Sequence, residues 1–278
     1  MNDFKAAGFN VESEEDIGIL FSKILKSYLT QTIKGEDVDY VVYQDPSGAE
    51  IWMTIQKNGR TTPNNIDPDY ASSSTCEVYV EKELVFDKDF KEGGYYVWSN
   101  PEPDGKGLGD SPLVLNVPNF EVVRSKIKSG NYKVAITAFA RRVDYSVDEK
   151  EYFAKQDRKP IFAVGYFVPS GTFTDDDPPK PLAMFSGTIK KVSLKKNGLG
   201  GRKFYAMTVD SLPGLMDVVC DASLFKVKPE VGGIIEGDFW MTGKFVLPGG
   251  FGVPVRKSQH TVMMEKTTIG RLIKKFKK

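Results

Sequence analysis

The sequence has very little histidine and cysteine, and both shortages limit its chemistry. His260 is the only histidine among 278 residues, which excludes a metal site built on two histidines and a mechanism that uses a histidine pair. Cys76 and Cys220 are the only cysteines, and each lies in a strand-like segment where a free thiol behaves as a small apolar side chain. This usage predicts a reducing, cytoplasmic location.

Several diagnostic patterns are also missing. No apolar run approaches the ~20 residues that span a bilayer, and the first ten residues lack the basic-then-apolar pattern of a secretory signal. The chain contains no P-loop, no C-x-x-C pair and no G-x-S-x-G turn. We therefore expect no metal and no cofactor, and we do not predict an enzyme. The 37 Asp and Glu residues leave a catalytic carboxylate pair open.

The composition is that of a globular protein with an uneven distribution of charge. Its 40% hydrophobic and 12% aromatic content is enough to fill cores, and its length suits roughly two domains. Residues 1–180 contain 21 Lys and Arg against 30 Asp and Glu, a net charge of −9, whereas residues 181–278 contain 17 against 7, a net charge of +10. Two interpretations remain open: the basic half attracts an acidic partner, or the two halves attract each other.

The N-terminal region predicts one helix and one hairpin. Ser13 can cap a helix over residues 14–29, since three acidic residues follow it and apolar residues then recur at helical spacing. Strands over residues 40–44 and 50–56 flank Asp45-Pro46-Ser47-Gly48, in which Pro fixes φ and Gly supplies the unusual turn conformation. The pattern indicates a helix that packs beside a β-hairpin.

This order of helix, strand, D-P-S-G turn and strand resembles half of a vicinal-oxygen-chelate module, the repeat of glyoxalases and extradiol dioxygenases. In that family the strand after the turn carries a metal-binding Glu. Trp52, in Ile51-Trp52-Met53, occupies the corresponding position here. The resemblance covers about 50 residues and implies the fold without the metal chemistry of the family.

The rest of the acidic half is expected to be mostly β. Strand-like segments occupy residues 75–84, 94–99, 111–117, 132–142 and 161–168, with helical segments at 119–127 and 147–156. The polar stretch 58–70 predicts a loop that borders a cleft near Trp52 and Trp98. A small-molecule binder or an enzyme that uses such a cleft is one of the functions that stay open.

Residues 182–266 resemble an OB-fold barrel. Five strands are expected, at residues 183–191, 204–210, 215–221, 231–246 and 255–264, with a helical turn between the third and the fourth. In that fold the face of strands two and three binds oligonucleotides or oligosaccharides. We therefore predict an α+β, mostly β protein with an acidic α+β domain over 1–170, a linker over 171–181, an OB-like barrel over 182–266 and a basic helix or tail over 267–278.

The clearest binding signal is a basic cluster on the first barrel hairpin, where an aromatic residue follows the lysines. Basic side chains track a phosphate backbone and aromatic rings stack on bases, although a lysine-rich hairpin is also simply a soluble edge. The residues are Lys190, Lys191, Lys195, Lys196, Arg202, Lys203 and Tyr205.

We hypothesise a cytoplasmic binding or adaptor protein whose barrel contacts single-stranded nucleic acid; an acidic protein partner is the alternative. The basic tail suits an anionic membrane surface, but packing on the barrel is favoured. The sequence does not indicate an oligomeric state.

Overall fold

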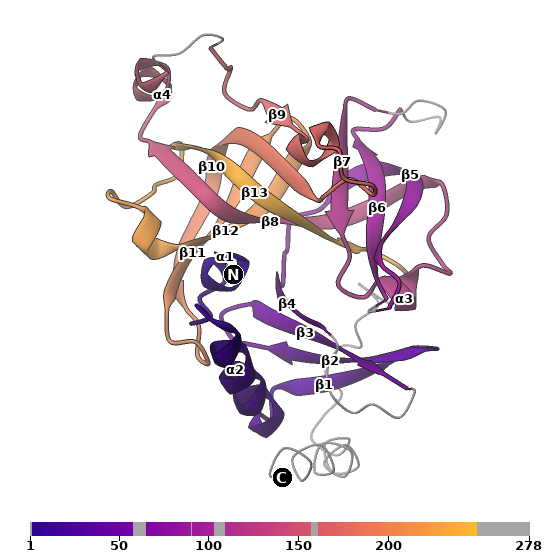
Figure 1. Cartoon of the computed structure of the whole chain (residues 1–278). Coiled ribbons are helices and arrows are strands. Elements are labelled where there is room, and N and C mark those ends of the chain that lie inside the picture. Colours follow the sequence, from indigo (N-terminus) through magenta and orange to yellow (C-terminus); the bar gives the residue numbers. More distant parts are fainter. Residues whose placement is uncertain (1, 58–64, 90, 103–108, 157–160, 249–278) are drawn as a thin grey trace.

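The computed structural model describes residues 2–57, 65–89, 91–102, 109–156 and 161–248 (Figure 1). The expected fifth barrel strand at 255–264, the basic tail at 267–278 and His260 lie outside the described residues. Within the described part of the chain, no helix is long and apolar enough to cross a membrane.

The N-terminal unit consists of two helices and a four-stranded antiparallel sheet. The helices are α1 (Asn2–Ala6) and α2 (Glu14–Lys26), and the strands follow one another in the order β1 (Thr30–Lys34), β2 (Val38–Gln44), β3 (Ala49–Gln56) and β4 (Asn65–Tyr70). Ser13 caps α2 as predicted, and Asp16 returns a hydrogen bond to complete a capping box. The buried face of α2 joins one apolar cluster with Val41, Ile51 and Met53 of the sheet.

The hairpin between β2 and β3 confirms the expected D-P-S-G turn. The amide of Asp45 donates to the carbonyl of Ala49 at 2.8 Å, and Gly48 has a φ of +94°. A Cβ atom at Gly48 would lie 2.9 Å from the Tyr70 ring, so both the backbone conformation and the space require glycine here. The turn is therefore held by β4 as well as by its own hydrogen bonds.

β4 corrects the prediction of a continuous loop over residues 58–70. Asn65–Tyr70 pairs with β3 along its whole length, although the segment is polar and contains Pro68. β4 lies at the edge of its sheet, where proline is tolerated because one side of the strand needs no ladder hydrogen bonds. A search for alternating apolar residues therefore misses this strand.

The remaining elements form one large mixed sheet with short helices at its margins, which agrees with the expected mostly β composition. The elements are β5 (Cys76–Asp87), β6 (Glu92–Ser99), β7 (Ser111–Asn116), α3 (Phe120–Val123), β8 (Gly130–Ser146), α4 (Glu149–Lys155), β9 (Phe167–Val168), η1 (Ser170–Phe173), β10 (Leu182–Lys196), β11 (Lys203–Ser211), β12 (Gly214–Asp221), η2 (Ala222–Leu224) and β13 (Ile234–Phe245). Of the strand expected over 161–168, only the last two residues are in β9.

Two rings of strands share β8 and β13. One ring closes in the order β10–β11–β12–β8–β13, with β12 and β8 parallel and the other neighbours antiparallel. The other follows β8–β5–β6–β7–β13 and closes through the pair Thr242 and Asn116. Figure 1 shows β8 crossing the molecule from one group of strands to the other.

A separate C-terminal OB-like barrel is not confirmed. The strand that completes the ring of β10 to β13 is β8, which precedes the predicted linker at 171–181. β13 pairs with β8 along its whole length, so it needs no following strand to satisfy that side. One continuous apolar core, including Val134 and Ile136 together with Phe185 and Phe239, fills both rings.

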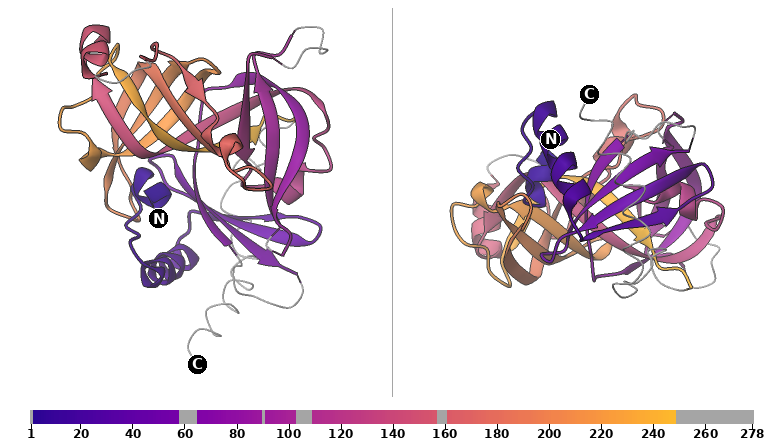
Figure 2. Two further views of the ribbon diagram at one scale, coloured as in Figure 1. Left: turned by 45° about the horizontal axis from the view of Figure 1, so that its top comes forward. Right: turned by 90° about the horizontal axis from the view of Figure 1, so that it is seen from below.

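The N-terminal unit packs against the outside of the ring that contains β10 to β13. Phe4 and Phe9 share an apolar cluster with Phe139 of β8, Phe204 of β11 and Val219 of β12. Figure 2 shows the unit along one side of the strands. The acidic N-terminal residues therefore lie directly on strands of the basic half.

Candidate interaction surface

Two of the predicted binding residues connect the N-terminal unit to the ring that contains β10 to β13. The ammonium of Lys195 donates to the carbonyl of Ser47 at 2.9 Å and to the hydroxyl of Tyr70 at 2.7 Å. The guanidinium of Arg202 pairs with Asp221 at 2.7 Å and lies 3.8 Å from Glu12. Both side chains thus have partners inside the molecule.

The other predicted residues fall into two environments. Tyr205 is 8% exposed, and its ring packs edge-on against Phe225 with centroids 5.2 Å apart, so it belongs to the core. Lys190 and Lys191 are exposed, and Lys190 pairs with Asp210 at 3.1 Å.

Lys196 and Lys203 lie directly opposite each other near the end of the β10–β11 hairpin. Both are exposed, and neither forms an ion pair with a described residue. The structure therefore places these two lysines side by side on the hairpin.

A second pair of lysines lies close to this hairpin. Phe225 follows η2 and packs on Tyr205, whose partner across the hairpin is Leu194. Lys226 directly follows Phe225, Lys228 comes two residues later, and both are exposed. The sequence analysis missed them, although the signal was present as two lysines that flank Val227 after the expected helical turn.

We call this surface the lysine face. It combines ammonium groups with aliphatic side chains, since Leu194 is 50% and Val227 is 59% exposed. Among the described residues none of its lysines has an ion-pair partner. Its members are Leu194, Lys196, Lys203, Lys226, Val227 and Lys228.

The face of β11 and β12 that the OB resemblance implies for ligands is covered. Phe204 and Val219 are both fully buried, and they pack with Phe9 of the N-terminal unit. A ligand could reach this face only if the unit moved away. Lys190, Lys191, Lys196 and Lys203 of the hairpin stay exposed.

Comparisons with protein-family models, curated proteins and solved structures found no match for this chain.

The two tryptophans proposed for a cleft lie in separate environments. Trp52 is 2% exposed, packs edge-on against Tyr40 and donates its Nε1 hydrogen to Glu50 at 3.0 Å. Trp98 lies on β6 and donates to Glu81. The first is a core residue of the N-terminal unit and the second belongs to the outer surface of the other ring.

A buried charge cluster, which the sequence did not reveal, joins β13 to the N-terminal unit. The ammonium of Lys244 lies 2.8 Å from Glu50 and 2.9 Å from Asp69, and it donates to the carbonyl of Tyr70 at 2.7 Å. Burial acts to lower the pKa of Lys244, but the two carboxylates outweigh it and hold the pKa above its usual value. The cluster has no open side for a ligand, so it holds the structure together.

A second acidic group lies at the start of β4 and β6. The Asn65 side-chain amide donates to Asp67 and also hydrogen-bonds Glu92. Burial raises the pKa of Asp67 to about 7, with a contribution from the charge of Glu92, and burial likewise raises the pKa of Glu92 to about 7. In the described ranges, no group of three or more His, Cys, Asp or Glu side chains is arranged to hold a metal ion.

Proposed function

We propose that this chain is a protein-interaction module that binds an acidic partner protein through the lysine face. The observation that carries the proposal is that two segments with exposed lysines meet at the Tyr205–Phe225 ring contact. They contribute four lysines that are not ion-paired to a described residue, together with the exposed aliphatic side chains of Leu194 and Val227. Lysines without intramolecular partners are free to pair with carboxylates of another molecule. The aliphatic side chains supply the apolar contact that a stable interface needs.

The same surface is less suited to single-stranded nucleic acid. Bases stack on exposed aromatic rings, but Tyr205 is buried and the apolar members of the lysine face are aliphatic. The OB resemblance remains part of the proposal at the level of the fold: β12, η2 and β13 follow the expected strand, helical turn and strand, and β8 supplies the fifth strand.

The test is fluorescence anisotropy on the whole protein with two labelled probes. One probe is a peptide of alternating Glu and Leu residues, and the other is a single-stranded oligothymidine. Each is titrated at low and at moderate salt. We expect the peptide to bind more tightly than the oligonucleotide, and its affinity to fall as salt screens the lysines.

A charge-reversal pair locates the surface. Lys196→Glu with Lys203→Glu is expected to weaken peptide binding by about tenfold or more, because two favourable charges become repulsive. Lys126→Glu with Lys128→Glu is the matched control, since both of these lysines are exposed near α3, away from the hairpin. Tighter binding of the oligonucleotide, or equal losses in the two variants, would refute the proposal.

A further inference from the structure

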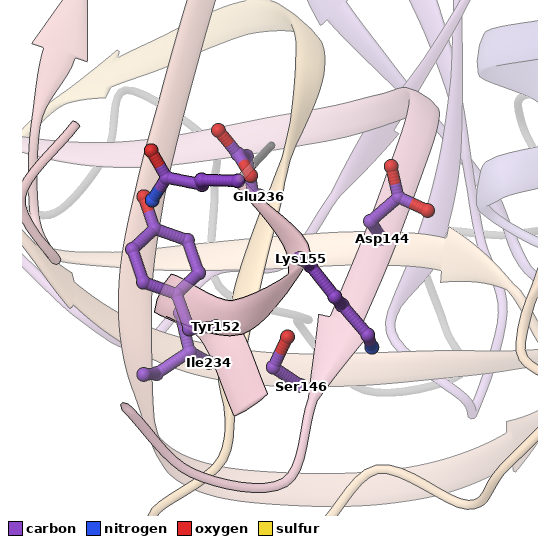
Figure 3. A pocket seen from close by; sticks show the side chains of 7 residues that line it. Asp144, Ser146, Tyr152, Lys155, Ile234 and Glu236 are labelled. Carbon is purple, nitrogen blue, oxygen red and sulfur yellow. The ribbon is translucent and has the colours of Figure 1, made fainter. Parts of the chain in front are cut away.

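The polar cavity between α4 and the ends of β8 and β13 is lined by two charged side chains that already have partners within the chain (Figure 3). The ammonium of Lys155 lies 2.8 Å from Glu151 and donates to the carbonyl of Tyr145 at 2.6 Å. Glu236 accepts from the Tyr166 hydroxyl at 2.8 Å. The ammonium group of this cavity is therefore not free to bind a ligand. Backbone groups without a partner among the described residues lie instead on β10.

One side of β10 loses its neighbouring strand at Ile189. Before this residue β10 pairs with β13. The last contacts on that side are two backbone hydrogen bonds at 2.8 Å, in which Ile189 donates to the carbonyl of Gly233 and accepts from the amide of Gly232. Over residues 191–196, β10 pairs with β11 alone among the described strands. We call the side of residues 191–196 that faces away from β11 the open edge.

The alternation of a β-strand shows which backbone groups face the open edge. In an antiparallel pair, successive residues direct their N–H and C=O groups to opposite sides of the strand. The amide of Asn197 donates to the carbonyl of Arg202 at 3.0 Å, so the backbone of Asn197 faces β11. Lys196, Leu194 and Val192 therefore face away from β11, since the register has no shift between them. No described residue on the open edge is hydrogen-bonded to their N–H or C=O groups.

The side chains beside the open edge determine what can pair with it. Lys191 and Lys196 are exposed, and Lys203 lies directly opposite Lys196 on β11. Lysines on an edge strand disfavour pairing with a second copy of the same edge, because like charges would then lie side by side. A strand with acidic side chains would instead place carboxylates beside these lysines. The exposed side chain of Leu194 offers apolar contact on the same face as Lys196.

We propose that the acidic partner binds by strand addition, in which an extended segment with acidic side chains pairs with the open edge of β10. This inference rests on the proposed function and specifies how the partner binds. Main-chain hydrogen bonds to Val192, Leu194 and Lys196 supply affinity, and the neighbouring lysines select acidic sequences. An acidic helix or a folded acidic surface would contact the lysines without using these backbone groups.

Backbone methylation of the probe peptide separates these two modes of binding. The peptide of alternating Glu and Leu residues is prepared in two further forms, one N-methylated at every Glu and the other at every Leu. Each form is titrated against the whole protein by fluorescence anisotropy. In an added strand only one of the two sets of amides faces β10. We therefore expect one form to bind about tenfold more weakly than the unmethylated peptide, because it loses several hydrogen bonds, and the other form to bind nearly as well.

A substitution on β10 tests the same hydrogen bonds from the protein side. Leu194→Pro removes the N–H that faces the open edge without removing a ladder hydrogen bond to β11. Leu194→Ala is the matched control, since it shortens the same side chain and keeps the N–H. We expect Leu194→Pro to weaken peptide binding by a factor of about three or more beyond the effect of Leu194→Ala. Thermal melts check that both variants fold.

The outcomes distinguish this inference from the proposed function. If the unmethylated peptide binds and the charge reversal at Lys196 and Lys203 weakens it, equal affinities of the two methylated peptides would overturn strand addition alone. Equal affinities of folded Leu194→Pro and Leu194→Ala for the peptide would do the same. If the unmethylated peptide does not bind, the proposed function fails and strand addition fails with it.

Discussion

At the scale of single residues, Lys244 shows how the two charged halves of the sequence meet. Its ammonium is buried between Glu50 and Asp69. Part of the excess positive charge of the C-terminal half is therefore neutralised by acidic residues of the N-terminal unit. Removing one partner from a buried ion pair leaves the other charge without compensation, at a cost of about 3–5 kcal/mol. The net contribution of the intact cluster is smaller, because burial of the charges is itself unfavourable.

Lys244→Met is therefore expected to lower the free energy of unfolding by about 3 kcal/mol or more, measured by urea denaturation. Lys133→Met, an exposed lysine on β8, is the control and should change it by less than about 0.5 kcal/mol. Adding Glu50→Gln and Asp69→Asn to Lys244→Met should recover part of the loss, because no unpaired charge then remains. Equal stability of Lys244→Met and the parent protein would contradict the interpretation.

Asp67 and Glu92 should make the folded protein less stable as the pH rises. This is the opposite of ordinary acid denaturation, in which stability is lost as the pH falls. Their pKa values rise from 3.8 and 4.5 to about 7 on folding, so the folded protein keeps protons that the unfolded chain has lost. Raising the pH from about 4.5 to 8 should therefore lower the free energy of unfolding by several kcal/mol for the pair, since each unit of pKa shift corresponds to about 1.4 kcal/mol. Asp67→Asn with Glu92→Gln should flatten this dependence in urea titrations at both pH values; an unchanged slope would exclude the pair as its source.

At the scale of elements, Asp217 of β12 holds the connection between β4 and β5. Its carboxylate accepts from the Ser72 hydroxyl at 2.8 Å, the Ser73 amide at 2.9 Å and the Ser74 hydroxyl at 2.9 Å, and it also accepts from Thr208 of β11. These hydrogen bonds hold the pKa of Asp217 below its usual value although burial acts to raise it. The Asp217 side chain thus binds the segment that follows the N-terminal unit to β11 and β12.

Asp217→Ala should release residues 71–75 without unfolding the protein. We expect faster amide hydrogen exchange in that segment and a loss of about 2–4 kcal/mol in stability, since several buried donors lose their acceptor. Asp210→Ala, which removes an exposed carboxylate on β11, is the control. Unchanged exchange at residues 71–75 in Asp217→Ala would show that other contacts hold the segment.

Local elements could be predicted from the sequence to a useful extent, whereas the strands with which they pair could not. The Ser13 cap and the D-P-S-G turn carry their own local hydrogen bonds, so the sequence reveals them directly. Met216, Val218 and Cys220 alternate along β12, and all three lie in the core of the rings. The pairing of β8 with both β12 and β13 depends on contacts across long sequence separations, which periodicity does not encode.

The candidate surfaces follow the same division. The sequence could point to Lys196 and Lys203 because they lie on one hairpin. It could not indicate that Lys195 and Arg202 are used by the N-terminal unit, or that β13 stops pairing with β10 before residues 191–196.

At the scale of the whole molecule, the shared strands make the two rings depend on each other. Residues 181–278 alone lack β8, which removes one of the neighbours of β12 and one of the neighbours of β13 and exposes core residues such as Val218 and Phe239. We expect this fragment to be largely unfolded by far-UV circular dichroism and by the narrow dispersion of its amide NMR signals.

A permuted fragment is the matched control. Phe245 of β13 lies opposite Val134 of β8, so a short Gly-Ser linker can join residue 248 to residue 130. A fragment of residues 182–248 followed by 130–146 is expected to regain strand structure, because it contains every strand of that ring. Cooperative unfolding of 181–278 without β8 would show that the ring closes by another route.

The position of β8 in the chain also affects how the protein is made. A ribosome that adds about 5–20 residues per second needs roughly 5–20 s to move from Ser146 to Phe245, where β13 ends. During that time β8 has emerged without two of its three neighbouring strands, and side chains such as Ile136 and Phe139 lack the part of their apolar clusters that comes from β10 to β13. The nascent chain should therefore be a chaperone client until the last strand arrives, however stable the finished molecule is.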